Sequence, residues 1–228
     1  CEKEIFNRIL KEELVPATGC TEPVAIAYAA AAAKKALGCE PEVCEAELSG
    51  NIIKNARCVA VPNTGGLKGI EAAVAAGVVA GRAELALDVL SAATGREEEI
   101  RDFLEKRGVS VRPADNDLTF FIRVTVGAGS SRAKAVIEGF HTNLVLIEKD
   151  GIELFRSGAK SNPCCVADRS MLTVEKIVEF ADVADLAEIR EILERQIAFN
   201  SAISEEGLKG DWGANVGKVI LKTFGDSP

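Results

Sequence analysis

The chain is poor in several residue types, and each shortage limits what it can be. Its 228 residues include one histidine, one tryptophan and one tyrosine, and no stretch is rich in lysine or arginine. With a formal net charge of −8, the chain lacks the basic surface that binding to a nucleic-acid backbone requires. We therefore expect no nucleic-acid partner, whereas a small anion at a local site stays open.

Long hydrophobic runs are also missing. The longest run, Val24–Ala33, is too short and too rich in alanine to span a bilayer. No basic segment followed by an apolar stretch and a cleavage site is present. Because 47% of the residues are hydrophobic, the chain can still bury a sizeable core. The sequence predicts a globular, cytoplasmic protein with no membrane partner.

The seven cysteines contain no CxxC pair. An odd number at such spacings argues against a zinc ribbon and against the disulfide framework of a small secreted protein. Cys39, Cys44 and Cys58 have no second type of metal ligand nearby in the sequence, so we interpret them as packing residues. For Cys164 and Cys165, a redox pair, metal ligands and an accessible loop without function all remain open.

The hydrophobic period changes twice along the chain and predicts an α+β fold. Residues 1–108 form a helical region rich in small residues, residues 109–156 an antiparallel β module, and residues 157–228 a C-terminal helical segment. The chain begins without methionine and stops soon after a helical pattern, so we expect this segment to continue into an absent C-terminal half.

The same patterns predict individual elements. The expected helices before the β module are Lys3–Leu14, Val24–Leu37, Gly66–Ala80, Ala83–Ala93 and Arg96–Lys106. The expected strands are Val109–Arg112, Leu118–Val126, Ala133–Gly139, Asn143–Glu148 and Ile152–Arg156. Asp150-Gly151 predicts a tight hairpin between the last two strands. Helix then returns from Thr173 to Lys222.

Cys20 stands between turn residues directly before the alanine-rich helix. Thr21 is a good N-cap, and Glu22 and Pro23 are favoured in the first turn. Unpaired N–H groups and the positive end of the helix dipole stabilise an anion there, which predicts a lowered pKa for the Cys20 thiol. The alternative is a small, buried, apolar residue at a helix start.

Two loops have the residues to bind a small carboxylate. Ser49–Asn55 places a serine, two asparagines and a lysine beside a glycine, and Val61–Gly69 runs a glycine-rich turn into a helix. Backbone N–H groups, amides and lysine ammonium groups donate charge-assisted hydrogen bonds to anions. The candidate substrate-binding residues are Ser49, Asn51, Asn63, Thr64, Gly65 and Gly66. Ordinary turn and capping roles are the alternative, and the spacing of a nucleotide-binding loop is absent.

The order of several motifs resembles a known family. The motifs are PATGCTEP, SGNIIKNA, VPNTGGLKGIEAAVAAG, HTNLVLIEKDG, DRSMLT and SAISEEGLKGDWGANVGK. They resemble the L-cysteine desulfidases, which are related to the alpha region of iron–sulfur L-serine dehydratases. The match covers nearly the whole chain, and GCTEP and SGNIxKN are its specific elements. It implies a carbon–sulfur lyase with a 4Fe-4S cluster and no pyridoxal phosphate, which converts L-cysteine to pyruvate, ammonia and sulfide.

The resemblance also implies roles for individual residues. Cys20 matches the family's N-terminal cluster ligand, and the family's other cluster cysteines lie in a C-terminal half beyond this chain. The chain alone is therefore expected to lack both the cluster and the activity. For the longer protein, we expect Lys54, or else Lys68, to remove the α-proton of a small amino-acid substrate.

Several alternatives stay open. Glu22 is either an acid or a first-turn stabiliser of the helix, and His141 is either a structural residue of the sheet or a catalytic one. L-serine as the substrate is an alternative for the reaction. A non-catalytic amino-acid-binding protein is the alternative from another functional class. Assembly of the chain into a homo-oligomer is a further alternative.

Overall fold

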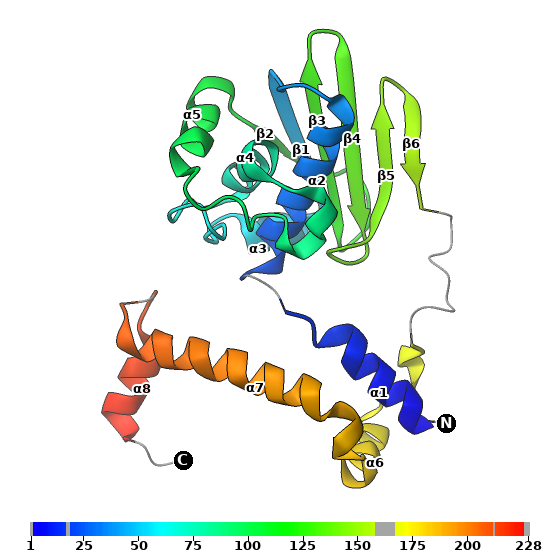
Figure 1. Ribbon diagram of the computed structural model, residues 1–228, viewed down its shortest axis with the longest axis vertical. Coiled ribbons are helices and arrows are strands. Elements are labelled where there is room, and N and C mark those ends of the chain that lie inside the picture. The colour runs from blue at the N-terminus through cyan, green and yellow to red at the C-terminus, as the bar shows by residue number, and fades with distance from the viewer. Residues whose placement is uncertain (1, 17–18, 158–166, 212, 226–228) are drawn as a thin grey trace. The chain divides into compact units, whose positions relative to one another are not determined.

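The computed structural model describes residues 2–16, 19–157, 167–211 and 213–225 (Figure 1). The chain divides into two compact units, a larger one of residues 17–161 and a smaller one of residues 1–16 with 162–228. The predicted boundary between residues 108 and 109 lies inside the larger unit. The combination of helices with a mostly antiparallel sheet confirms the expected α+β fold.

A six-stranded sheet forms one layer of the larger unit. Its strands in spatial order are β2 (Ser110–Pro113), β1 (Val43–Leu48), β3 (Phe121–Ala128), β4 (Ser131–Glu138), β5 (Leu144–Lys149) and β6 (Ile152–Arg156). Neighbours are antiparallel except β1 and β2, which are parallel. The predicted hairpin is confirmed, since Asp150 and Gly151 join β5 to β6 with φ angles of 51° and 81°.

Helices cover one face of this sheet. Figure 1 shows α2 (Thr21–Leu37) lying across the strands, with α4 (Ile70–Ala80) beside it. Both helices are almost entirely buried, and α2 packs against β3 and β4, where Ile122 and Val124 face inward. α5 (Glu97–Arg107) packs on α4 and ends at Gly108, as predicted. Small side chains on both central helices permit this close packing.

Three predictions for the first hundred residues are wrong. Val43–Leu48 is the strand β1 inside a region expected to be helical, because pairing with β2 and β3 and burial of alternate residues outweigh local helix propensity. Ser49–Asn55 is not a loop, since α3 spans Gly50–Ala56. The helix expected at Ala83–Ala93 is a short 3₁₀ helix, η1, of Ala83–Asp88.

The predicted N-cap of α2 is also wrong. The helix begins at Thr21 itself, and Cys20 occupies the N-cap position with extended dihedral angles of φ −61° and ψ 125°. No side chain caps the helix there. The first amides of α2 therefore lie next to the cysteine rather than behind a threonine hydroxyl.

The smaller unit contains helices only among its described residues. They are α1 (Glu2–Glu13), the 3₁₀ helix η2 (Arg169–Met171), α6 (Val174–Val183), α7 (Leu186–Lys209) and α8 (Val216–Phe224). Phe6 of α1 stacks on Phe180 of α6 with ring centroids 4.9 Å apart. Phe6 and Ile9 of α1 and Ile189 of α7 are buried. The predicted return to helix after Thr173 is confirmed, and none of the described helices is long and apolar enough to cross a membrane.

Candidate functional site

Glu22 receives hydrogen bonds from two different segments at the start of α2. The Cys20 Sγ donates to Glu22 Oε2 at 3.0 Å, and Asn55 Nδ2 of α3 donates to Glu22 Oε1 at 3.2 Å. Pro62 marks the approach of a third segment, because a Cβ built on Gly19 would lie 3.1 Å from its ring. The glycine-rich segment Val61–Gly69 thus begins beside the same end of α2.

His141 adds a titratable ring to this corner of the larger unit. It lies between β4 and β5, and its ring makes an edge contact with Phe120 at a centroid distance of 4.7 Å. Its Nε2 is buried and has no hydrogen-bond partner within the described part of the chain. The charges of His141 and Glu22 act on one another. We call Cys20, Glu22, Asn55 and His141 the Cys20 cluster.

The environment fixes the protonation states of this cluster at neutral pH. Burial lowers the pKa of His141 and outweighs the opposing effect of Glu22, which favours a neutral ring. The hydrogen bond from Cys20 is the largest cause of a lowered pKa for Glu22, and Asn55 and His141 lower it further. The cluster therefore contains a carboxylate and a neutral imidazole that interact electrostatically.

The expected lowering of the Cys20 pKa is wrong. Burial, followed by the hydrogen bond to Glu22, raises the pKa of the thiol. The negative charge of Glu22 adds to this effect and opposes the positive end of α2. Burial first and the carboxylate two residues away second keep the thiol protonated, so the sulfur is a hydrogen-bond donor in this structure.

Three of the predicted substrate-binding side chains serve the fold. The hydroxyl of Ser49 donates to the Thr119 carbonyl at 2.9 Å and accepts from Phe121 N–H at 3.3 Å. Thr64 is fully buried and donates to the Val61 carbonyl at 2.8 Å. Asn63 adopts φ 59° and donates to the Leu90 carbonyl at 3.1 Å. These contacts hold the ends of the loops in place, and substrate contact by these residues stays a prediction.

The remaining candidates are exposed. Asn51, Lys54 and Lys68 have no hydrogen bond or ion pair from their side chains to any described residue, and all three lie at the surface. Gly65 and Gly66 are also exposed, with φ angles of 64° and 87°. The structure therefore gives no contact between either lysine and the Cys20 cluster.

The described residues do not hold a metal cluster on their own. Within residues 2–16, 19–157, 167–211 and 213–225, no three His, Cys, Asp or Glu side chains are grouped so that they could bind a metal ion. Cys39 and Cys58 are exposed and Cys44 is buried, whereas Cys164 and Cys165 lie outside the described residues. Cys20, which is partly exposed, fits a single ligand position.

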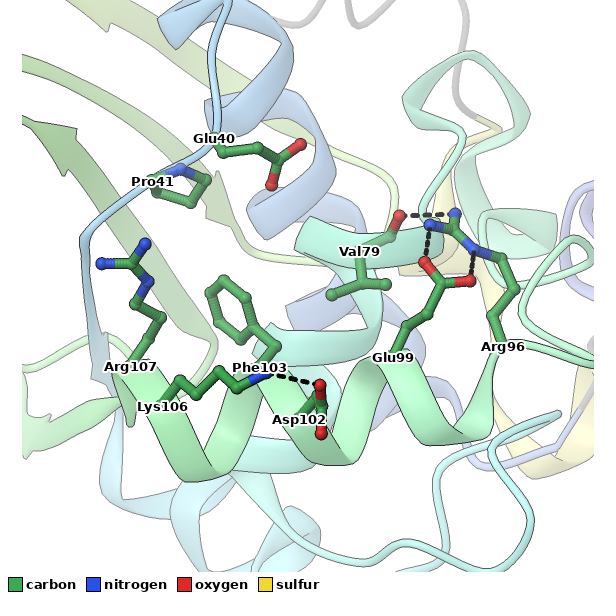
Figure 2. Close-up of a pocket in the computed structure, with 9 residues that line it drawn as sticks. All are labelled: Glu40, Pro41, Val79, Arg96, Glu99, Asp102, Phe103, Lys106 and Arg107. Atoms are coloured by element: carbon green, nitrogen blue, oxygen red, sulfur yellow. Dashed lines mark hydrogen bonds and ion pairs between the residues drawn. The ribbon is translucent and has the colours of Figure 1, made fainter.

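A hollow away from the Cys20 cluster lies along α5 and has a volume of about 330 Å³. Figure 2 shows its lining, in which Phe103 points toward the hollow between charged side chains. Arg96 pairs with Glu99 at 2.6 Å, and Lys106 pairs with Asp102 at 2.6 Å. Most of its charges are already neutralised by neighbours, and the lining contains no cysteine or histidine.

Sequence reasoning missed Asn55 as a partner of Glu22 and the electrostatic interaction of His141 with Glu22. The only local signal was that a single histidine begins the HTN motif. Residues 22, 55 and 141 come together only when α3 and the turn after β4 fold against the start of α2. No spacing in the sequence reports that arrangement.

Comparisons with known proteins give relatives but no activity. A UPF0597 protein of Desulfitobacterium hafniense is 45% identical over 225 residues, which are 98% of this chain and 52% of the relative. UPF0597 proteins of Lachnoclostridium phytofermentans and Treponema denticola are 42% and 41% identical, each over 96% of this chain and 52% of the relative. This name states no activity, substrate or cofactor.

The chain spans about half the length of the curated relatives it matches. No family model matches it, and no solved structure does. Similarity to UPF0597 proteins over nearly the whole chain is therefore the result of these comparisons.

Proposed function

We propose that this chain is part of a lyase that eliminates the β-substituent of a small L-amino acid, with L-cysteine as the expected substrate. The observation that supports it most is the Cys20 cluster, in which His141, with an unpartnered buried nitrogen, lies near the carboxylate of Glu22. Such an elimination needs a group that removes the proton from the α-carbon, and a neutral imidazole can do so.

His141 is a better candidate for this base than the two lysines. A lysine acts as a base at neutral pH when burial or neighbouring charge removes its proton, whereas Lys54 and Lys68 are both exposed. His141 is held by Phe120 and has a buried, unpartnered Nε2. We therefore propose His141 in the role that the sequence assigned to Lys54.

The proposed reaction balances as follows. His141 Nε2 takes the α-proton, the electron pair forms the Cα–Cβ double bond, and the Cβ–S bond breaks with release of hydrosulfide. The aminoacrylate product tautomerises to an imine, and water hydrolyses the imine to pyruvate and ammonia. Glu22 would stabilise the imidazolium that forms, because an opposite charge nearby favours the protonated ring.

The iron–sulfur cluster is part of the proposal for a protein of the relatives' full length. Cys20 would be one of its ligands, and the others would come from outside the described residues. When bound, such a cluster supplies a Lewis acid for the leaving group. L-serine fits the same groups, so the identity of the leaving group is a question for the experiment.

The test uses this chain joined to the half of the D. hafniense relative that it does not match. The fusion is purified without oxygen and reconstituted with iron and sulfide, and pyruvate and sulfide are measured with L-cysteine, L-serine and D-cysteine. We expect His141→Asn to lower kcat about 100-fold or more with little change in KM. Lys54→Met and Lys68→Met are the matched controls and should keep the activity.

Two results would contradict the proposal. Full activity of His141→Asn together with loss in Lys54→Met would return the role to the lysine. Binding of L-cysteine without turnover, in a fusion that contains its cluster, would favour an amino-acid-binding protein instead.

A further inference from the structure

Exposed apolar side chains are concentrated in the smaller unit. Fifteen large hydrophobic residues between Leu172 and Phe224 are exposed. Scattered single residues of this kind are ordinary on a protein surface, but contiguous apolar patches on a soluble protein mark interaction sites. Their positions around the helices α7 and α8 show which of them share one helical face.

Three apolar residues of α7, Ile189, Phe199 and Ile203, share one side of the helix, because they lie within about 80° of one another at 3.6 residues per turn. Ile189, near the start of the helix, is 4% exposed, because α1 and α7 pack together there. Farther along, Phe199 and Ile203 are 52% and 71% exposed. The same side of α7 is therefore covered at its beginning and uncovered toward its end.

α8 continues this pattern. Val216, Val219, Ile220 and Phe224 follow the spacing of one helical face, and all four are exposed, Phe224 by 70%. α8 has no fully buried residue among those described, and it packs only lightly on α7. An amphipathic helix with this pattern ordinarily gains its stability from burying such a face.

We name these residues the α7–α8 apolar face. They are Phe199 and Ile203 of α7 and Val216, Val219, Ile220 and Phe224 of α8. Glu194 and Glu205 lie on the opposite side of α7 from Ile203. Burial of such side chains favours association, and part of that gain is offset by the entropy lost on binding.

The relatives indicate what covers this face. Eight UPF0597 proteins match 94–99% of this chain but only 51–52% of their own length. Each relative therefore contains a comparable length of polypeptide that this chain does not match. We propose that the α7–α8 apolar face binds polypeptide equivalent to this unmatched half, as a helix-in-groove or helix-on-helix interface.

The experiment measures this interaction directly and does not depend on any enzymatic activity. The chain is coexpressed with the unmatched half of the D. hafniense relative, and the complex is analysed by size-exclusion chromatography with light scattering. We expect a one-to-one complex. Ile203→Asp and Val219→Asp should each weaken it at least tenfold, because a buried carboxylate without a partner opposes docking.

Ala198→Asp is the matched control. Ala198 is also an exposed residue of α7, but at 3.6 residues per turn it lies about 140° around the helix from Ile203. It adds the same charge to the same helix and should leave the complex intact. Circular dichroism of all variants checks that the helices form.

A second measurement covers the case in which the separate half is insoluble. In the fusion of the chain with that half, Ile203→Cys should react with a maleimide at least tenfold more slowly than in the chain alone, whereas Ala198→Cys should react equally in both. Equal labelling of Ile203→Cys in both would overturn the proposal. A dimer of the chain alone that Ile203→Asp dissociates, without any complex with the half, would assign the face to a second copy.

Discussion

Gly77 of α4 lies so close to Ala27 of α2 that a Cβ built on Gly77 would be 2.2 Å from the Ala27 carbonyl oxygen. The two helices thus meet backbone to backbone at this point, and the neighbour that a side chain would strike cannot rotate away. α2 in turn packs on β3 and β4, so this contact joins α4 to the helix that covers the sheet.

Gly77→Ala is therefore expected to destabilise the larger unit by about 3 kcal/mol, as overpacking of a tight core does. Alanine favours a helix over glycine by about 1 kcal/mol. Because the cost of the clash is larger, the net effect of the substitution is a loss of stability. Denaturant unfolding followed by circular dichroism measures the change. Gly50→Ala is the control, because nothing lies within 4 Å of its Cβ, and equal losses in both variants would contradict the close contact.

Glu22→Gln is expected to make Cys20 more reactive. The substitution removes the negative charge that helps to raise the pKa of the thiol, so more thiolate is present at pH 8 and alkylation is several-fold faster. Peptide mapping after iodoacetamide treatment follows each cysteine separately. Exposed Cys58 in the same samples is the internal control, and an unchanged rate at Cys20 would show that Glu22 does not set its protonation state.

The buried thiol of Cys44 is expected to make the folded chain less stable at high pH. Burial raises the pKa of its thiol from 9.0 to about 12, so between these values the folded chain keeps a proton that the unfolded chain releases. The free energy of unfolding then falls as the pH rises through this window, by at most about 1.4 kcal/mol per unit. Below pH 9 this contribution is fully present.

The measurement for Cys44 compares unfolding curves between pH 8 and pH 11. Cys44→Ala should show a smaller decline with pH than the wild type, whereas Cys39→Ala, which removes an exposed thiol, should keep the full decline. Identical pH dependence in all three proteins would mean that Cys44 ionises without cost in the folded chain.

Arg96 links α4 and α5. Its removal is expected to lower the stability of the fold more than the loss of its ion pair with Glu99 alone. Its Nη1 donates to the Val79 carbonyl of α4 at 2.6 Å, while the same guanidinium pairs with Glu99 of α5 (Figure 2). Arg96→Ala should cost about 1–2 kcal/mol, because the Val79 carbonyl at the end of α4 loses its partner. Glu99→Ala breaks only an exposed pair and should cost less than about 1 kcal/mol by thermal unfolding; the reverse order would be inconsistent with the geometry.

The elements that the sequence predicts correctly are those that local chemistry determines. Asp150-Gly151 tolerates positive φ at both positions and so defines a hairpin without help from the rest of the chain. Gly108 ends α5 in the same local way. In contrast, Val43–Leu48 contains Glu, Ala and Leu, which favour helix, and becomes a strand only because β2 and β3 flank it.

The candidate site follows the same rule. The position of Cys20 at the start of α2 could be predicted, because the helix pattern begins there. The raised pKa of its thiol could not, since it depends on burial and on the rotamer that turns Glu22 toward the sulfur. His141 reaches this corner through a sheet register that links residues far apart in sequence, and no helix or strand propensity contains that information.

The place of β1 in the sheet bears on the order in which the chain folds. β3 to β6 follow one another through short turns, whereas β1 pairs with β2 and β3 only after the segment from Ser49 to Val109 has been enclosed. Closing a long loop is entropically costly and slows folding. Until β1 pairs with β3, the hydrogen-bonding edge of Phe121–Ala128 is open to other chains. During synthesis, the segment that the ribosome releases early therefore waits for strands made much later.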